Sequence, residues 1–434
     1  MESERSRLPS FPVSALLLII LATAPLRAAG NYFRVVERSG VWWFAAPSGQ
    51  LMLSIGVDTI SYRGDAIGRT AKHPYYDYVS KAYASRSVWV ATELKRLRSW
   101  GFNTVGAWSS PATWNRGMPY TVILDIAARS GGDWLKGIPA DYYSSSFEET
   151  ARHVAQSECA PRAHDQDLIG YFSDNELRWG PDWRGKQTML AMYLSLPASA
   201  PGRQHAINFL KRKYSDNIHT LNRAWRVHAT SFADIPSEAN THAYQSDNAG
   251  FLSMVARRYF QVCARAIREA DPNHLYLGAK FAGLPPYPVL RASQLCDVVS
   301  VDIYRFDARP EVRRIFQLAH RPVLVAEFAF RAEDSGLPNT KGAGPRVPDQ
   351  AARARAYKNY VTKLEGLPEA VGFHWFEWCD EPKQGRFDGE NSNYGLVNIQ
   401  DRPYRQFVTT IKAVNHAVPA VHRAQTKTAN PQSP

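Results

Sequence analysis

Eight short apolar segments, separated by stretches with helical character, most constrain the fold of this chain. They are rich in Val, Ile, Leu, Phe and Ala and lack a clean alternation of apolar and polar residues, which is typical of strands covered on both faces. The helical stretches between them favour parallel crossover connections. The segments cover residues 53–58, 103–108, 121–126, 168–173, 275–280, 297–302, 322–327 and 371–376.

Eight repeated strand–helix units predict an α/β fold, the (β/α)8 barrel, which typically needs about 250 residues. An open, doubly wound sheet is the alternative, but no GxGxxG motif follows an early strand. Residues 180–186 match GxxxxGK, yet Gln187 stands where a phosphate loop carries Ser or Thr. We therefore interpret this match as chance and favour the barrel.

The surplus length lies mostly in one connection, residues 177–274, which follows the fourth strand. It contains helical pieces of its own at 206–214 and 218–225, so we predict a large insertion that walls a substrate cleft. Before the first strand, residues 31–52 carry turn signals at Gly and Pro. These signals predict a short N-terminal β cap packed against one end of the barrel.

The two ends of the chain are predicted to lie outside this domain. Residues 1–29 resemble a secretory signal, because Arg5 and Arg7 precede an apolar stretch that ends in small residues. An uncleaved anchor is the alternative, although the stretch is short for a membrane span. Residues 30–416 then form the barrel domain, and 417–434 form a disordered tail. We expect a secreted or periplasmic protein whose mature chain has no stable membrane span.

The chain is basic, with 52 Lys and Arg against 40 Asp and Glu, a formal charge of +12. Such an excess suggests nucleic acid, an anionic surface or an acidic substrate as partner. The longest basic run, residues 211–213, lies in the predicted insertion without a nucleic-acid motif around it. Solubility or attraction to an anionic glycan is the favoured interpretation, and nucleic-acid binding the weaker hypothesis. The sequence leaves the oligomeric state open.

Four cysteines in 434 residues exclude a scaffold built from disulfides. They form no CxxC motif, and the sequence has no HExxH or paired Cys/His spacing typical of a zinc site. We predict buried thiols or one disulfide, and neither a metal site nor a cofactor.

Two of the predicted strands end in glutamates. Glu176 lies just past the fourth strand, and Glu327 closes the seventh. Active sites of (β/α)8 barrels lie at the carboxyl ends of the strands, and strands four and seven face each other across the mouth. Glycoside cleavage needs two such carboxyls, one to protonate the leaving oxygen and one to attack the sugar or activate water. A separation of about 5 to 5.5 Å implies retention of configuration, and a wider one inversion.

The Asn175-Glu176 pair and the strand-ending Glu327 resemble glycoside hydrolase clan A. Further strings are similar to the β-agarase group of that clan and its β-galactosidase-like relatives. The resemblance implies a retaining glycoside hydrolase for a galactose-containing polysaccharide or oligosaccharide, with Glu176 as acid/base and Glu327 as nucleophile. The similar strings cover residues 170–176, 214–225, 271–278, 327–339, 374–380 and 385–391.

The resemblance implies three further roles. Asn175 would hydrogen-bond the sugar 2-hydroxyl, and Tyr304, just after the sixth strand, would orient Glu327 through its hydroxyl. Trp375, in the eighth strand, would form the floor beneath the bound sugar. The alternatives are a turn asparagine for Asn175 and a packed aromatic for Tyr304.

Position alone adds weaker candidates for substrate binding. The rule for barrels directs Asp58, Trp108 and Lys280 toward the cleft, because they end strands one, two and five. The loop 385–393 is dense in polar groups able to recognise sugar hydroxyls. A solvated turn is the alternative for this loop, whose candidates are Asp388, Glu390 and Asn391.

One departure from the clan pattern bears on activity. Clan members often carry an arginine near the end of strand two that contacts the nucleophile, whereas here the strand ends Gly106-Ala107-Trp108-Ser109. Either another residue supplies the contact or the activity is altered. A catalytically inactive barrel that binds carbohydrate is therefore the alternative hypothesis. Glu377, beyond strand eight, is a rival carboxylate outside the clan's catalytic positions.

Overall fold

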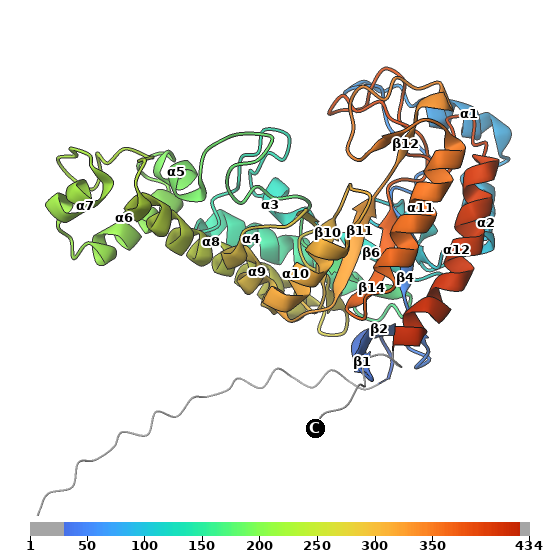
Figure 1. The fold of residues 1–434 in the computed structure, drawn as a ribbon, viewed down its shortest axis with the longest axis horizontal. Helices are drawn as coiled ribbons and strands as arrows, with labels where there is room; N and C mark the ends of the chain where they lie inside the picture. The colour runs from blue at the N-terminus through green and yellow to red at the C-terminus, as the bar shows by residue number, and fades with distance from the viewer. Residues whose placement is uncertain (1–29, 426–434) are drawn as a thin grey trace, which may run out of the picture.

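The computed structural model describes residues 30–425, which are built around one nine-stranded sheet (Figure 1). All neighbouring strands in this sheet are parallel, in the order β8-β7-β6-β5-β4-β14-β11-β10-β9. Seven of the eight predicted segments each contain or overlap one strand of the sheet, and the fifth contains one strand and adjoins a second. The strands are β4 (Ser54–Val57), β5 (Thr104–Val105), β6 (Tyr120–Ile123), β7 (Leu168–Phe172), β8 (Leu275–Tyr276), β9 (Phe281–Ala282), β10 (Val299–Asp302), β11 (Val323–Phe328) and β14 (Ala370–Trp375).

The sheet closes on itself through the fifth predicted segment, which is split into β8 and β9. β8 pairs with β7, and the carbonyl of Tyr276 in β8 also accepts a hydrogen bond from the N–H of Asp297, at 2.9 Å, next to β10. β9 pairs with β10 directly. Between the two pieces, Gly278 and Lys280 have φ values of 91° and 39°, which interrupt the ladder. The predicted (β/α)8 barrel is confirmed, and the open sheet is excluded.

Helices surround the barrel, so its strands are covered on both faces: β7, β11 and β14 are buried at every residue (Figure 1). The side chain of Ser85 accepts a hydrogen bond from the N–H of Val88 and so caps the helix that begins at Arg86. None of the helices in residues 30–425 combines the length and the apolar composition that a membrane span requires. The surrounding helices are α1 (Pro74–Ala82), α2 (Arg86–Ser99), α3 (Ile126–Arg129), α4 (Ser145–Val154), α9 (Tyr287–Ala292), α10 (Arg309–Ala319), α11 (Gln350–Leu364) and α12 (Arg405–Ala424).

A three-stranded antiparallel sheet precedes the barrel, as predicted for residues 31–52. It consists of β1 (Arg34–Arg38), β2 (Val41–Ala45) and β3 (Leu51–Met52). The N–H of Trp42 bonds the carbonyl of Pro368, just before β14, which places this cap at the amino ends of the strands. Phe33 and Phe44 join the buried cluster inside the barrel. The cap therefore closes the end opposite the mouth.

The predicted tail is wrong for residues 417–424, which continue α12. Val418 and His422 are buried there, and the ring nitrogens of His422 lie 2.9 Å from the carbonyl oxygen of Trp42 and 3.1 Å from that of Glu365. These contacts join the chain's end to its N-terminal cap and to α11, and the local composition does not reveal them. Residues 426–434, and the signal predicted at 1–29, lie outside the described residues.

The insertion after β7 carries four helices: α5 (Met189–Leu194), α6 (Pro201–Lys213), α7 (Ile218–Trp225) and α8 (His242–Ala270). α5, α6 and α7 project from the barrel as an arm, attached through the long α8 (Figure 1). Buried Asp247 of α8 holds the arm, because Tyr214 and Trp225 each donate a hydrogen bond to it at 2.7 Å. The helical pieces predicted at 206–214 and 218–225 correspond to α6 and α7.

The longest basic run has a structural explanation. Residues 211–213 form the last turn of α6, where positive side chains interact favourably with the negative end of the helix dipole. Lys213 also pairs with Asp247, and Lys211 lies 3.4 Å from Asp216. This run therefore needs no anionic partner.

All four cysteines are buried free thiols, one of the two predicted states. Burial is the largest cause that raises the pKa of each of these thiols. They contribute to the core as small apolar groups.

Candidate active site

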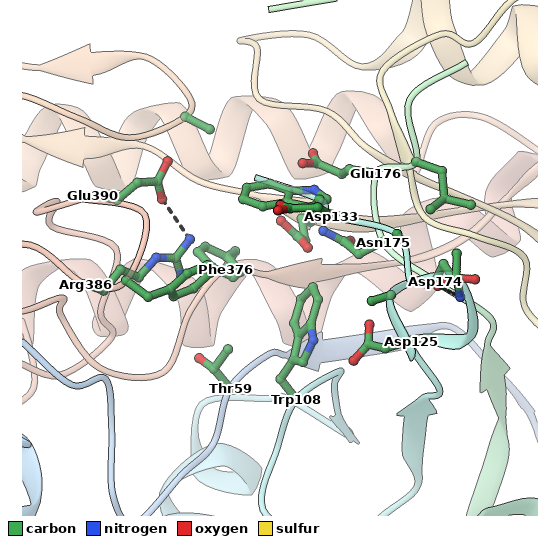
Figure 2. Close-up of a pocket in the computed structure, with 18 of the residues that line it drawn as sticks. Thr59, Trp108, Asp125, Asp133, Asp174, Asn175, Glu176, Phe376, Arg386 and Glu390 are labelled. Carbon is green, nitrogen blue, oxygen red and sulfur yellow. Dashed lines mark hydrogen bonds and ion pairs between the residues drawn. The ribbon is translucent and has the colours of Figure 1, made fainter. Parts of the chain in front are cut away.

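A cavity of about 450 Å³ lies at the mouth of the barrel, within the range of small-molecule sites. Every strand-derived part of its wall comes from the carboxyl end of a strand or the loop that follows. In Figure 2, Asn175 and Glu176 lie on one side of the view and Arg386 and Glu390 on the other, with Trp108 below. Residues that line the cavity include Thr59, Asp65, Trp108, Asp125, Trp134, Asn175, Glu176, Arg184, Tyr304, Glu327, Phe376, Glu377, Arg386, Phe387 and Glu390.

Glu176 is held by its main chain while its carboxyl stays available. Its N–H donates to the carbonyl of Lys280 at 2.8 Å, and its own carbonyl accepts from the guanidinium of Arg184 at 2.8 Å. Within residues 30–425, its carboxyl makes no hydrogen bond. Burial, and then the negative charge of Glu327, raise the pKa of Glu176 to about 8. This carboxyl therefore carries a proton at neutral pH.

Glu327, the penultimate residue of β11, lines the same cavity and is only 4% exposed. Lys280 donates a hydrogen bond to its Oε1. The hydroxyl of Tyr304 donates to its Oε2 at 2.5 Å, which is the contact predicted for Tyr304. Both carboxylate oxygens are thus fixed, and the side chain has one defined orientation toward the cavity.

Asn175 and Trp108 also face the cavity, as predicted. The Oδ1 atom of Asn175 is buried and has no hydrogen-bond partner among residues 30–425, so it can accept a bond from a sugar hydroxyl. Trp108 is half-buried, with φ of 55°, and its ring covers the ammonium of Lys280 at 4.0 Å. Its other face is an apolar surface at the cavity wall.

The prediction that Trp375 forms the sugar-binding floor is wrong. Trp375 is fully buried, its indole N–H donates to the carbonyl of Tyr394, and its ring packs on Phe328 and Phe407. Successive side chains of a strand point to opposite faces, so Trp375 points outward toward the helices. Phe376, one residue on, lines the cavity instead.

We expect Trp375→Ala to reduce stability and leave substrate affinity unchanged. Loss of a large buried aromatic side chain costs on the order of 3 to 5 kcal/mol, because the site collapses only partly. Thermal denaturation should show a lower Tm, while KM measured below the new transition stays at the wild-type value. Trp183→Ala is the control, since this tryptophan is 64% exposed and should not move Tm. An unchanged Tm with a raised KM for Trp375→Ala would instead support a role of Trp375 as the sugar-binding floor.

Asp58 and Lys280 lie beneath the cavity and do not line it. Asp58 is fully buried, where its Oδ1 accepts from the N–H of Ala107 at 2.8 Å and lies 3.5 Å from the ring of His374. Lys280 is also fully buried and reaches Glu327 from below. Neither side chain can touch substrate, so their predicted role in direct substrate binding is wrong. The end of a strand was a correct guide to the neighbourhood of the cavity but not to its wall, because both side chains are buried by their contacts.

The polar loop divides into one cavity residue and two structural ones. Glu390 lines the cavity and pairs with Arg386 at 3.0 Å. Asp388 also pairs with Arg386, at 2.9 Å, but does not line the cavity. Asn391 accepts hydrogen bonds from the N–H groups of Thr340 and Lys341 at 3.0 and 3.2 Å. Asp388 and Asn391 hold loops together with their side chains and lie outside this cavity, so their role in substrate binding stays a prediction.

The sequence did not predict a cluster of acidic side chains around Arg386, although Glu377 was noted as a rival carboxylate. Asp65, Glu377 and Glu381 place carboxylate oxygens within 4.8 Å of one another, a spacing that suits a cation. Arg386 already provides a positive charge there, 3.0 Å from Glu381. Burial raises the pKa of Glu377 and of Glu381 well above the usual range. Of these, Asp65, Glu377 and Arg386 line the cavity, where their polar groups can form hydrogen bonds with sugar hydroxyls.

Two long loops meet over the cavity. Trp134, from the loop after α3, lies 6.5 Å from the ring of Phe387, from the loop after β14. Arg184, in the segment that matches GxxxxGK, packs its guanidinium over Trp134 at 5.7 Å and pairs with Asp182. That segment therefore holds the main chain of Glu176 and the ring of Trp134 through Arg184, and its glycines belong to this loop rather than to a phosphate loop. Only contacts between distant loops identify these residues, so the sequence carried no signal for them.

A closed (β/α)8 barrel with glutamates at the ends of strands four and seven, both facing one cavity, defines a class of protein. It agrees with the resemblance to clan A glycoside hydrolases found in the sequence. No family model matches the chain.

Among characterised proteins, the chain is similar to two agarases of Vibrio sp. (strain JT0107). It is 31% identical to β-agarase B over 357 residues, which cover 77% of this chain and 36% of the relative. It is 28% identical to β-agarase A over 454 residues, which cover 87% of this chain and 45% of the relative. The chain thus spans less than half the length of these relatives.

Solved structures agree with this similarity. The crystal structure of an agarase, AgWH50C, superposes with a TM-score of 0.79 at 25% identity, covering 92% of this chain and 66% of that one. The structure of an exo-β-agarase gives a TM-score of 0.79 at 24% identity, covering 91% and 66%. The protein is therefore β-agarase-like in sequence and fold.

Proposed function

We propose that this chain is a retaining glycoside hydrolase that cleaves O-glycosidic bonds of a galactose-containing polysaccharide or its oligosaccharides. The agarase relatives support the substrate class. The observation that carries the mechanism is one cavity shared by two unlike glutamates. Glu176 has a pKa raised to about 8 and an unbonded carboxyl, and Glu327 is fixed at both oxygens. Two carboxyls whose surroundings push their properties apart are suited to separate acid and nucleophile roles.

In the first step, a carboxylate oxygen of Glu327 attacks the anomeric carbon while the bond to the leaving oxygen breaks. Glu176 gives its proton to that oxygen, so the departing sugar leaves as an alcohol. Tyr304 continues to hold the Oε2 side of Glu327 during attack. Asn175 accepts a hydrogen bond from the sugar hydroxyl next to the reacting carbon.

In the second step, water attacks the same carbon and the ester bond to Glu327 breaks. The esterified Glu327 carries no charge, so one cause of the raised pKa of Glu176 is absent and that pKa falls. Glu176 can then accept the proton of the attacking water. Two inversions at one carbon give a product with the configuration of the substrate.

The test is the configuration of the first product formed. We expect proton NMR, recorded before mutarotation, to show the β anomer when the mature chain cleaves agarose or agar-derived oligosaccharides. Cellulose is the control glycan and should stay intact. Initial release of the α anomer would contradict the retaining mechanism. Saturable binding without released reducing ends would instead support the inactive carbohydrate-binding barrel.

We also propose that the protein acts outside the cytoplasm, in the periplasm or the medium. The support is the signal-like segment at residues 1–29 together with a polysaccharide substrate. Fractionation of expressing cells with an epitope at the C-terminus tests this proposal.

A further inference from the structure

We propose that Lys280 is a positioning residue that supplies, from strand five, the cationic contact to the nucleophile that strand two lacks, while its main chain holds Glu176. The inference rests on the proposed function, since it assigns Lys280 a part in the reaction of these glutamates. If the proposed function holds, this contact replaces the one that the clan pattern places on strand two.

Strand two has no room to supply a cation. A Cβ atom built on Gly106 would lie 2.0 Å from Oδ1 of Asp58, so any side chain there collides with a buried carboxylate. Ala107 is buried in the barrel interior. Trp108, the next residue, turns its ring over the ammonium of Lys280 at 4.0 Å. The end of strand two therefore covers a cation that comes from elsewhere.

The ammonium of Lys280 is fully enclosed beneath the cavity. It donates to Oε1 of Glu327 and lies 3.9 Å from Oδ1 of Asp302. Its side chain is fully buried and absent from the cavity wall. Lys280 can therefore influence the reaction only through its neighbours, and Glu327 is the neighbour that faces substrate.

The main chain of Lys280 fixes the second glutamate. Its carbonyl accepts the N–H of Glu176 at 2.8 Å, and its own N–H donates to Oγ of Ser300 at 2.9 Å. Its φ of 39° is costly for a residue with a Cβ and occurs at the break between β8 and β9. A single residue thus contacts Glu327 with its side chain and Glu176 with its backbone, which links the positions of the two carboxyls.

Several acidic groups crowd around this pair, and the ammonium lies among them as a counter-ion. Asp58 follows β4, Asp302 ends β10 and Glu176 follows β7, and these three groups surround Glu327 and Lys280. Glu390 and Tyr304 approach from the cavity side. Burial and the charge of Glu327 raise the pKa of Asp302 well above its usual range. Lys280 is a buried cation among these groups, and its ammonium offsets part of their negative charge beside Glu327.

The experiment compares two neutral variants, Lys280→Met and Lys280→Gln, with the charged variant Lys280→Arg. We expect both neutral variants to lower kcat/KM at neutral pH by about 100-fold. The acidic limb of their pH profiles should move to higher pH by about one unit, because the buried carboxylate has lost its counter-ion. KM should change by less than about threefold, since Lys280 does not touch substrate. Lys280→Arg should restore the acidic limb toward its wild-type position, which a loss of packing alone would not explain.

Two neutral variants keep the test decisive if one fails to fold, and Tm identifies the one that does. A wild-type pH profile in a folded neutral variant overturns the inference, as does an acidic limb that stays displaced in Lys280→Arg. The same assay on Glu327→Ala distinguishes failure of the proposed function from failure of the role proposed for Lys280. If Glu327→Ala is fully active, the proposed function fails. If Glu327→Ala is inactive and Lys280→Met keeps the wild-type profile, only the role of Lys280 fails.

Discussion

Replacing Glu327 by glycine should lower kcat/KM on agar oligosaccharides by on the order of 10⁴ to 10⁶-fold, the range expected when a nucleophile is removed. The carboxylate that bonds the anomeric carbon is gone, and the neighbouring Glu176 cannot replace it from the opposite side of the sugar. The ammonium of Lys280, beneath the cavity, and the hydroxyl of Tyr304, at its wall, remain in place but lose the carboxylate that they bond in the wild type.

Azide gives this variant a diagnostic product. With an activated aryl β-glycoside, added azide can enter the space left by the side chain and attack the anomeric carbon from that face. The product is then the α-glycosyl azide, with the aryl alcohol as leaving group, which NMR identifies. Glu377→Gly is the matched control, because Glu377 is also a buried glutamate that lines the cavity. Its carboxylate accepts a hydrogen bond from Thr59, and it does not stand at a predicted catalytic position. A β-glycosyl azide from Glu327→Gly would assign the nucleophile to another residue.

The barrel could be predicted because its strands are buried on both faces and leave continuous apolar runs in the sequence. The break in strand five could not be predicted. The run 275–280 reads as one strand, but Lys280 leaves the ladder to bring its backbone to Glu176 and its ammonium to Glu327. A residue that satisfies two long-range contacts at the cost of a positive φ gives no local signal.

The candidate site was predicted where it depends on the ends of strands and failed where it depends on side-chain direction. Glu176 and Glu327 follow from the ends of the strands, Asn175 and Tyr304 follow from the resemblance to clan A, and the structure brings all four to one cavity. The prediction for Trp375 is wrong because neighbouring side chains of a strand point to opposite faces of the sheet, so an assignment off by one residue selects the wrong face.

The loop residues of the cavity were missed for a different reason. Arg386, Asp65 and Trp134 reach the cavity from loops separated by long stretches of sequence. The same is true of the tail, where His422 becomes buried only by contact with Trp42. Burial and charge pairing between distant loops come from the tertiary fold, so neither periodicity nor spacing predicts them.

Glu176→Ala should affect the two steps of the reaction differently. Removal of a general acid and base typically costs 10²- to 10⁴-fold. For natural oligosaccharides, whose leaving oxygen needs a proton, we expect a loss near the upper end of this range. For an activated aryl glycoside, whose leaving group departs as an anion, formation of the glycosyl-enzyme should be nearly normal, and its hydrolysis should become rate-limiting.

The pH dependence of kcat/KM should show that Glu176 acts in its protonated form. In the wild type, Glu176 has a pKa of about 8, so it is protonated below that pH and loses its proton as the pH rises through it. kcat/KM for a natural oligosaccharide should therefore fall above about pH 8, and this basic limb should be absent when Glu176→Ala acts on the activated glycoside. A basic limb that persists near pH 8 in this variant would place the acid on another group.

Azide should again identify the role, with the opposite stereochemistry from that expected for Glu327→Gly. In Glu176→Ala the glycosyl-enzyme on Glu327 still forms, and azide, which needs no base, attacks it from the face that water uses. The ester bond to Glu327 breaks and the product is the β-glycosyl azide. Glu176→Gln is the matched variant, because it keeps the volume of the side chain and should show less rescue by azide. The α-azide from Glu327→Gly and the β-azide from Glu176→Ala can both arise only if the two residues act from opposite faces of one sugar. Lys280, which contacts both glutamates, links their positions in this geometry.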